Sequence, residues 1–200
     1  KLLSILLLCF CFSATAQNAS TIQQLLDEGV TIGELLDAGL TPEELYGLEH
    51  QGGLLFDVDE ELGTGKVVFK NQNAMGSIHI ATLSSYSSCC SDYPAIETDP
   101  DAHGLVNTQL LADVFDYSIY DFALNSNFNG YSDWYVPMPS EALHIAQRYR
   151  EGRFIDADGL PNFYIGYSRI ATSHYDIPTY KIQSVQNISS DSGTPEFGSN

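Results

Sequence analysis

Residues 130–150 read GYSDWYVPMPSEALHIAQRYR. The second half of this stretch predicts a helix over 139–150, with Gly152 directly after its end. Glu141 falls in the first turn, where a carboxylate interacts favourably with the helix dipole. The residues of this helix that are available for burial are Ala142, Leu143, Ile145, Ala146 and Tyr149. The stretch therefore predicts one helix of a packed domain and the chain that leads into it.

Two large residues in the chain that leads into this helix, Trp134 and Pro137, are predicted to be structural. A large aromatic side chain before a helix start commonly fills the space between the helix and a sheet. Contact with a ligand is the alternative role for both residues. For Glu141 the structural role is also favoured, because the helix dipole accounts for its position.

Outward from this helix, the sequence mixes strands and helices. Four strands are predicted, over residues 53–59, 66–70, 164–171 and 178–185. Residues 63–65 form the expected hairpin turn between the first two strands. Apolar residues at helical spacing predict a further helix over 108–125, with a break near Tyr117. This order favours an α+β fold over a doubly wound parallel sheet.

Three copies of a ten-residue repeat precede these elements, and they begin at Thr21, Thr31 and Thr41. Each copy predicts a short helix with a capping box, which the side chains of Gln24, Glu34 and Glu44 complete. Helices this short must bury their apolar residues on one another or on the main domain. We expect residues 21–50 to be a spacer, and a partner-docking surface is the alternative.

The first sixteen residues have the pattern of a secretory signal peptide. Lys1 supplies a positive charge, an apolar run follows, and small residues precede a cleavage site after Ala16. The apolar run is shorter than the roughly twenty residues that a membrane helix needs, and no later segment approaches that length. The sequence therefore predicts a secreted or cell-surface protein with residues 1–16 removed, a linker over 17–20 and no transmembrane segment.

The chain is strongly acidic, with 8 Lys and Arg against 26 Asp and Glu and a net charge of -18. Such a charge repels phosphate backbones and anionic surfaces, so nucleic acid and acidic glycans are poor partners. Solubility outside the cell is a further reason for this composition.

The predicted mature chain keeps two cysteines, Cys89 and Cys90, because Cys9 and Cys11 belong to the leader. The Cα atoms of neighbouring residues lie about 3.8 Å apart, below the roughly 4.4 Å minimum of ordinary disulfides. Three alternatives stay open for the pair, namely free thiols, pairing with a cysteine beyond Asn200, and a vicinal redox switch.

Five segments together resemble one protein family. Residues 130–137, with Glu141 after them, resemble its W-x-L-P-S-x-x-E-L signature. The other four follow in the family's order, with 51–59 resembling its GGxIFYLD strand, 65–68 its GLVVA strand, 104–108 its GxxNT segment and 165–173 its YWSSSE segment. The chain is thus similar, from residue 51 to about 186, to a large family of bacterial extracellular domains related to the C-terminal domain of the Legionella collagen-like adhesin.

The resemblance implies that residues 51–200 form a C-type-lectin-like domain. Such a domain has a curled antiparallel sheet flanked by two helices, and irregular loops that carry any binding site. The GxxNT segment would introduce the first helix. The family-motif residues, with a structural role implied, are Asn107, Thr108, Asp133, Trp134, Pro137 and Glu141.

Two departures from the family pattern change these expectations. Met138 replaces the signature serine, so the hydroxyl cap opposite Glu141 is lost, and Ser140 becomes the candidate cap of a helix that starts one turn later. The family's closing VRPVR strand has no counterpart, which leaves the edge of residues 53–59 exposed. We therefore expect the domain to be truncated here and the full-length protein to continue past Asn200.

Calcium is the cofactor to test, since lectin-like folds often use it. Asp156 and Asp158 begin a segment that looks like a calcium loop, and Asp99, Asp101 and His103 form a second acidic cluster. Neither group completes a set of six or more oxygen ligands.

Tyrosines are the most suggestive candidates for ligand contact. Those in predicted loop or strand-end positions are Tyr86, Tyr93, Tyr131, Tyr164, Tyr167 and Tyr175. Their flat rings could stack on a sugar or on a protein partner, and a core role is the alternative for each.

No catalytic spacing is present in the sequence. The five histidines show no H-E-x-x-H pattern, and no G-x-S-x-G elbow or glycine-rich phosphate loop occurs. A Ser-His-Asp set could still assemble in space. The sequence therefore predicts a non-catalytic binding or adhesion module that recognises a glycan or a surface protein. The alternative is a structural spacer or assembly domain of a larger extracellular protein.

Overall fold

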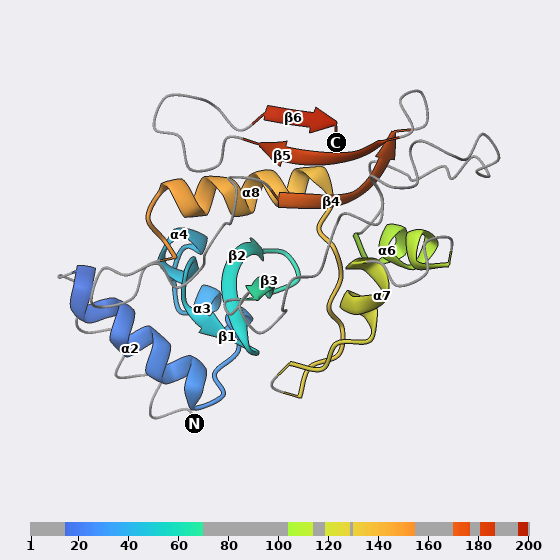
Figure 1. Cartoon of the computed structure of the whole chain (residues 1–200). Coiled ribbons are helices and arrows are strands. Elements are labelled where there is room, and N and C mark those ends of the chain that lie inside the picture. Colours follow the sequence, from blue (N-terminus) through green and yellow to red (C-terminus); the bar gives the residue numbers. More distant parts are fainter. Residues whose placement is uncertain are drawn as a thin grey trace.

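The computed structural model describes residues 15–69, 104–113, 119–128, 130–154, 170–176, 181–186 and 196–199, with side chains for 19–69, 104–113, 119–128 and 130–154. In chain order its elements are α2 (Thr15–Asp27), α3 (Ile32–Asp37), α4 (Pro42–Leu45), β1 (Glu49–His50), β2 (Gly53–Asp59), β3 (Thr64–Phe69), α6 (Gly104–Ala112), α7 (Ile119–Leu124), α8 (Pro139–Arg150), β4 (Ile170–Asp176), β5 (Lys181–Gln186) and β6 (Glu196–Ser199) (Figure 1). Helices and antiparallel strands together make an α+β structure, as the sequence predicts.

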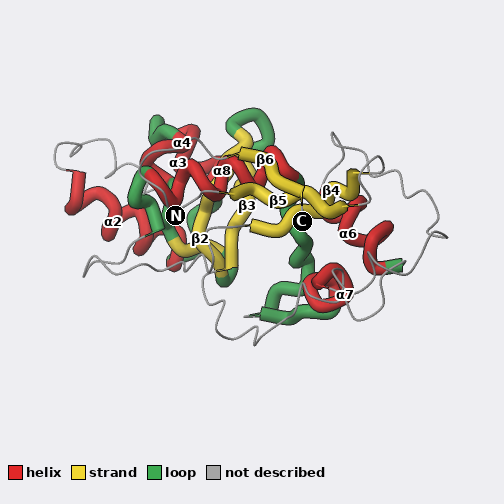
Figure 2. Tube along the Cα trace, turned by 45° about the horizontal axis from the view of Figure 1, so that its top comes forward, coloured by secondary structure: helices red, strands yellow, loops and turns green. Residues whose placement is uncertain are grey.

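The strands form two antiparallel sheets, with the orders β1-β2-β3 and β4-β5-β6. Helix α8 contacts β2 on one side and β4 and β5 on the other, so it lies between the sheets (Figures 1 and 2). Its bounds, Pro139–Arg150, are those predicted. Since helix α8 starts at Pro139, Ser140 lies inside it and does not cap it, so that expectation is wrong.

Strand β2 is buried on both faces and forms the centre of the core. Leu54 and Phe56 belong to a cluster with Ala142 and Ile145 of α8. Leu55, between them, belongs to a second cluster with the repeat helices. This division follows from strand geometry, because successive side chains point to opposite faces of a sheet. The run of apolar residues in β2 thus joins the repeats to the rest of the fold.

The hairpin between β2 and β3 turns earlier than expected. β3 begins at Thr64, so residues 60–63, not 63–65, make the turn. The Asp59 carboxylate fixes it by accepting the backbone N–H groups of Glu61 and Leu62 at 3.0 and 2.9 Å, a local bond that Asp favours in turns.

The repeat helices bury their apolar residues on β2 and on one another. Their buried residues are Ile22, Leu26, Ile32, Leu35, Leu40 and Leu45. The contact with the hairpin is close, because a Cβ added to Gly63 would lie 2.8 Å from the Cα of Gly33. Packing on the main domain, one of the two expected arrangements, is therefore present.

Capping of the repeats follows the prediction in two of the three copies. Thr31 and Glu34 form a capping box, with bonds of 3.2 Å from the Glu34 N–H to the Thr31 hydroxyl and 2.9 Å from the Thr31 N–H to the Glu34 carboxylate. The Thr41 N–H likewise donates to the Glu44 carboxylate at 2.9 Å.

The first copy differs, because α2 runs from Thr15 through Thr21. Residues 17–20 are therefore helical, and Thr21 lies inside the helix and is not its cap. No Pro or Gly stands between Thr15 and Thr21 to stop the helix from extending backwards.

The predicted helix over 108–125 corresponds to α6, which ends at Ala112, and to α7, while the expected break near Tyr117 lies outside the described residues. α6 begins at Gly104, so the segment 104–108 lies inside the first helix instead of preceding it. Among the residues that the structure describes, no helix is both long and apolar enough to cross a bilayer.

The C-terminal strands differ most from expectation. β5 matches its prediction closely, whereas β4 shares only residues 170–171 with the predicted strand over 164–171. β6 pairs antiparallel with β5, with Val185 opposite Phe197, although the sequence predicted no strand there. Four residues are too few for an apolar alternation to be recognised.

The edge of β2 is partly covered. β1 pairs with its first residues, with His50 opposite Gly53, and the Gly47 N–H donates to the Leu55 carbonyl at 2.8 Å. The expectation of an edge exposed along residues 53–59 is therefore wrong for its first half. The chain that closes it comes from the end of the repeats.

Candidate functional site

Glu141, in the first turn of α8, is the centre of a polar network whose side chains come from three elements and the chain before α8. Its side chain is only 7% exposed. One oxygen accepts the Met138 N–H at 2.8 Å, which is the carboxylate half of a capping box. The other accepts the Lys66 ammonium and the Tyr135 hydroxyl, each at 2.9 Å. The carboxylate half of the box is thus kept without the signature serine, and donors from β3 and from the chain before α8 satisfy the second oxygen.

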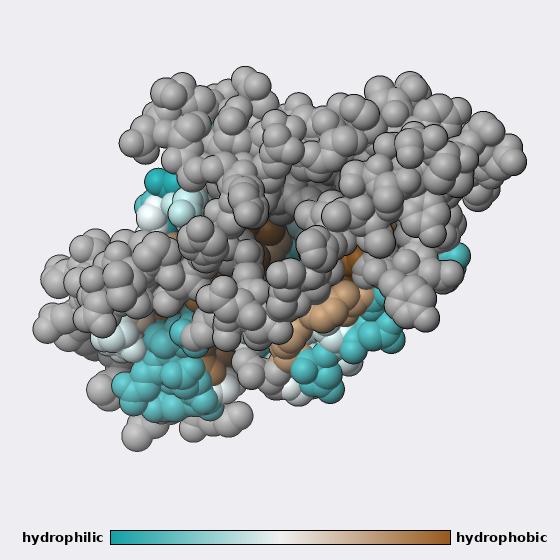
Figure 3. Space-filling view, viewed as in Figure 1, coloured by the Kyte–Doolittle hydropathy of each residue, from teal (hydrophilic) through white to brown (hydrophobic). Residues whose placement is uncertain are grey.

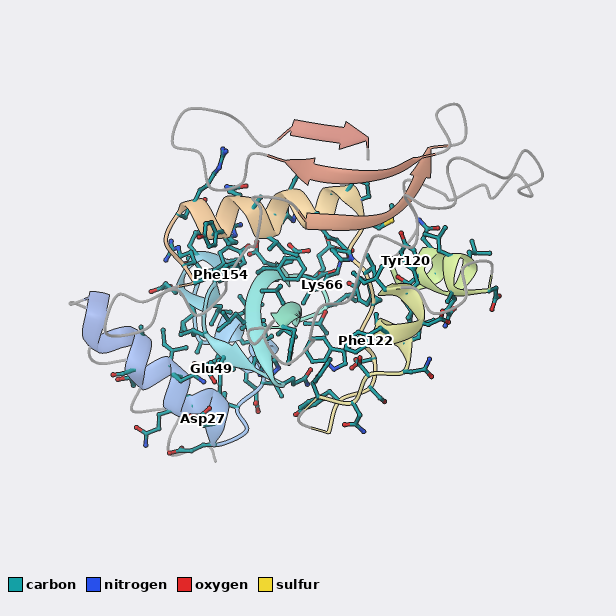
Figure 4. The ribbon with its side chains drawn as sticks, in the orientation of Figure 1. Asp27, Glu49, Lys66, Tyr120, Phe122 and Phe154 are labelled. Atoms are coloured by element: carbon teal, nitrogen blue, oxygen red, sulfur yellow. The ribbon has the colours of Figure 1, made fainter. Side chains whose placement is uncertain are left out.

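The network continues from Lys66 toward solvent. The Lys66 Nζ lies 3.7 Å from one oxygen of Asp57, on β2, and the His144 Nδ1 lies 3.4 Å from the other. The hydrogen bond from His144, followed by the positive charges of His144 and Lys66, lowers the pKa of the Asp57 carboxyl. His144 is 49% exposed, so the network runs from a buried acid to an accessible imidazole. We call Asp57, Lys66, Tyr135, Glu141 and His144 the Glu141 network; Figure 4 labels Lys66.

Helix α6 packs its first turn directly on this network. A Cβ added to Gly104 would lie 2.6 Å from the Tyr135 ring and 2.8 Å from a Glu141 carboxylate oxygen. Burial, and then the charge of Glu141, raise the pKa of the Tyr135 hydroxyl, which keeps it a neutral donor. Glycine at 104 therefore allows α6 to approach the buried acid.

The residues that follow in α6 hold the chain before α8. The Val136 N–H donates to the Thr108 hydroxyl at 3.1 Å, and that hydroxyl is 2.7 Å from the Gly104 carbonyl. The Asn107 amide lies 3.0 Å from the Met138 sulfur, and both residues are buried. The structure thus brings Asn107, Thr108 and Glu141 to one place, although they are separated in sequence.

A second feature precedes α8, a turn that we call the aromatic turn and define as residues 125–128 and 130–134. Phe128 and Tyr131 exchange two backbone hydrogen bonds of 3.0 Å, and Gly130, at φ +87°, supplies the left-handed backbone between them. The Trp134 indole N–H donates to the Tyr131 carbonyl at 2.9 Å. These bonds fix the shape of the turn.

Aromatic packing attaches this turn to β3. The Phe69 ring stacks on Phe128 at 4.1 Å between centroids, and Trp134 meets both rings edge-on at 5.4 and 5.8 Å. Trp134 is partly buried, and its ring lies against β3 through Phe69. Pro137 is also partly buried.

Tyr131 projects from the turn. Its residue is 38% exposed, and within the described part of the chain its side chain has no ring contact or hydrogen bond. Asn127, Ser132 and Asp133 beside it are exposed as well. Figure 3 shows a hydrophobic stretch bordered by hydrophilic residues over the region that α7 and the following chain occupy in Figure 1.

The other predicted ligand contacts cannot be placed beside Tyr131. Tyr175 lies in β4, where side chains are not described. Eleven residues that the sequence analysis singled out lie outside the described ranges. They are Tyr86, Tyr93, Cys89, Cys90, Asp99, Asp101, His103, Asp156, Asp158, Tyr164 and Tyr167. In the ranges that are described, no group of three or more His, Cys, Asp or Glu residues could hold a metal ion. Calcium binding stays a prediction.

Sequence reasoning missed four members of the Glu141 network, Asp57, Lys66, Tyr135 and His144. One signal was available for Lys66, because no other Lys or Arg occurs between residues 2 and 69. A lone base in a valine-rich strand indicates a specific acidic partner. Nothing in the spacing indicates that this partner is Glu141, since 75 residues separate the two.

The sequence matched no protein-family model, and neither the curated proteins nor the solved structures gave a match.

Proposed function

We propose that this protein is a secreted or cell-surface, non-catalytic binding or adhesion module with a C-type-lectin-like body. The observation that carries the proposal is that its polar residues fall into two groups, one bonded within the protein and one exposed. Those of the Glu141 network bond one another, whereas Asn127, Ser132 and Asp133 of the adjoining aromatic turn are exposed. The network holds together the elements around the start of α8, and the exposed side chains of the turn are available to a ligand.

The arrangement of the network favours a structural role over a catalytic one. A general acid or base must exchange a proton with substrate, which requires an accessible atom. Both oxygens of Glu141 are engaged and its side chain is buried. The Lys66 ammonium is paired with two carboxylates, that of Glu141 at 2.9 Å and that of Asp57 at 3.7 Å.

The lectin-like body is supported by the order of its parts. An opening hairpin, β2 and β3, is followed by two helical regions, and α8 packs on β2. The resemblance implies a curled sheet with two flanking helices, for which α6 and α8 are the candidates. Export rests on the leader-like first sixteen residues.

A role as a spacer is less well supported. A spacer holds two bodies apart, and its own fold need not depend on either of them. The repeats instead share a hydrophobic cluster with Leu55 of β2, and residues 47–48 bond the edge of that strand. Their packing is that of an N-terminal layer of the domain.

The test is a search for ligands with the whole exported chain. Immobilised glycans and extracellular surface proteins would be probed with the chain, and we expect saturable binding to at least one. Absence of binding above background would refute the proposal. Hydrolytic turnover that His144→Ala abolishes would also refute it, because the exposed His144–Asp57 pair would then be catalytic.

A further inference from the structure

We propose that the aromatic turn binds neutral hexopyranose glycans, with the Tyr131 ring stacked on a sugar face and the polar side chains around it bonding the sugar hydroxyls. This inference rests on the proposed function, because it names the ligand class of the binding module.

The turn has a fixed shape before any ligand arrives. Its backbone is held by the paired bonds of Phe128 with Tyr131 and by the indole N–H of Trp134, and Phe128 is stacked on Phe69. A site on a fixed turn loses little conformational entropy on binding. Such preorganisation matters for sugars, whose individual contacts are weak.

The side chains around Tyr131 have the chemistry that a sugar requires. The exposed ring offers a flat apolar face, and Ser132, Asp133 and Asn127 offer a hydroxyl, a carboxylate and an amide. Within the described part of the chain, none of these three side chains has a hydrogen bond. By contrast, the Asn125 amide is already used, because it donates to the Asp121 carbonyl at 2.8 Å.

Charge selects neutral sugars over anionic ones. The described residues of the turn, 125–128 and 130–134, include no Lys or Arg, so the turn itself supplies no cation for a sulfate or a uronic acid. The described base that lies on β3, Lys66, is held by Glu141 and Asp57. Asp133 on the turn itself would repel an anionic sugar.

Size selects a sugar over a protein. A stable protein interface buries about 800 Å² on each partner and contains a group of apolar residues. Of the large apolar residues that the described part exposes, Tyr131 is the one on the turn, and Leu62, Val106 and Leu110 belong to other elements. One ring with polar neighbours matches a single sugar better.

The experiment uses Trp134 as a reporter placed in the site. It is the one tryptophan of the chain, so any change in tryptophan emission originates at the turn. The whole exported chain would be titrated with soluble neutral gluco-, manno- and galacto-oligosaccharides, and in parallel with sulfated and uronic-acid oligosaccharides. Affinities would be confirmed by calorimetry.

We expect at least one neutral oligosaccharide to change the emission and to bind about tenfold more weakly to Tyr131→Ala. Tyr131→Phe, which keeps the ring, retains most of the affinity, and Asp133→Ala weakens binding independently. Leu62→Ala is the matched control, because it removes another exposed apolar side chain and should leave affinity unchanged. Each variant is first shown to unfold at the wild-type urea concentration.

Three outcomes would overturn the inference and leave the proposed function standing. They are neutral-glycan binding that Tyr131→Ala does not weaken, binding confined to anionic glycans, and binding confined to a surface protein. Absence of binding to every glycan and protein would overturn both.

Discussion

The Glu141 network and the aromatic turn adjoin each other in sequence, yet they use polar groups in opposite ways. Glu141 is 7% exposed and accepts three hydrogen bonds, whereas the side chains of Tyr131, Ser132 and Asp133 are exposed and make no hydrogen bond within the described part of the chain. A buried polar group without a partner costs free energy, and an exposed one is satisfied by water. Substitutions in the network should therefore lower the free energy of unfolding of the protein, whereas substitutions of the exposed turn residues should leave it unchanged.

The largest effect is expected from Glu141→Ala, which should lower the free energy of unfolding by about 3 kcal/mol. It leaves the Lys66 ammonium and the Met138 N–H without their carboxylate. Glu34→Ala is the matched control, because Glu34 has the same capping role in α3 but is exposed. It should cost about 1 kcal/mol or less. Equal losses in urea unfolding would contradict the role of burial.

Gly104→Ala should be next, with a loss of about 2 kcal/mol from overpacking. The new Cβ would fall 2.6 Å from the Tyr135 ring, and the buried acid behind it prevents a simple shift. Gly33→Ala, also in a helix, is the control, since its Cβ would meet Gly63 at an ordinary 3.4 Å. We expect Gly33→Ala to be neutral or slightly stabilising. A tolerated alanine at 104, by the same unfolding assay, would mean that α6 can move away.

The local parts of this structure were predictable from sequence. Helix α8, strand β2 and the capped starts at Thr31 and Thr41 all depend on residues a few positions apart. Capping boxes, apolar spacing and glycine positions are patterns of residues that are close in sequence, so they can be recognised without the structure.

What sequence reasoning missed depends on distant contacts. Nothing near Glu141 indicates that Lys66 is its partner, and nothing near Leu55 indicates that the repeats cover it. The start of α2 was also missed. Thr21 has the pattern of a cap, but it lies inside the helix because no residue before it ends the helix. The candidate site was therefore half predictable: Tyr131 was named, and most of the Glu141 network was not.

Asp57 offers a pH test of the outer, exposed part of the network. Its pKa is lowered in the folded protein by the hydrogen bond from His144 and by the nearby positive charges. A lowered folded pKa contributes stability that is present above the unfolded value of about 3.9 and is lost as pH falls through the folded value. Asp57→Asn should thus cost about 0.5 kcal/mol at pH 7, and this cost should shrink as the pH falls below about 3.9. A difference between the two proteins that stays constant across this range would show that the carboxylate charge does not contribute.

The smallest effect on stability is expected at Tyr131, where the comparison is sharpest. Tyr131→Ala removes a large ring, yet the free energy of unfolding should change by less than about 0.5 kcal/mol, because the residue is exposed and its side chain has no ring contact or hydrogen bond among the described residues. Urea unfolding followed by Trp134 emission measures this at the turn itself. A loss above about 1 kcal/mol would mean that the ring is part of the core, since burial of an aromatic side chain stabilises by more than that. If Tyr131→Ala instead leaves stability unchanged and abolishes glycan binding, Tyr131 acts in binding alone, in contrast to the residues of the Glu141 network, which act in stability.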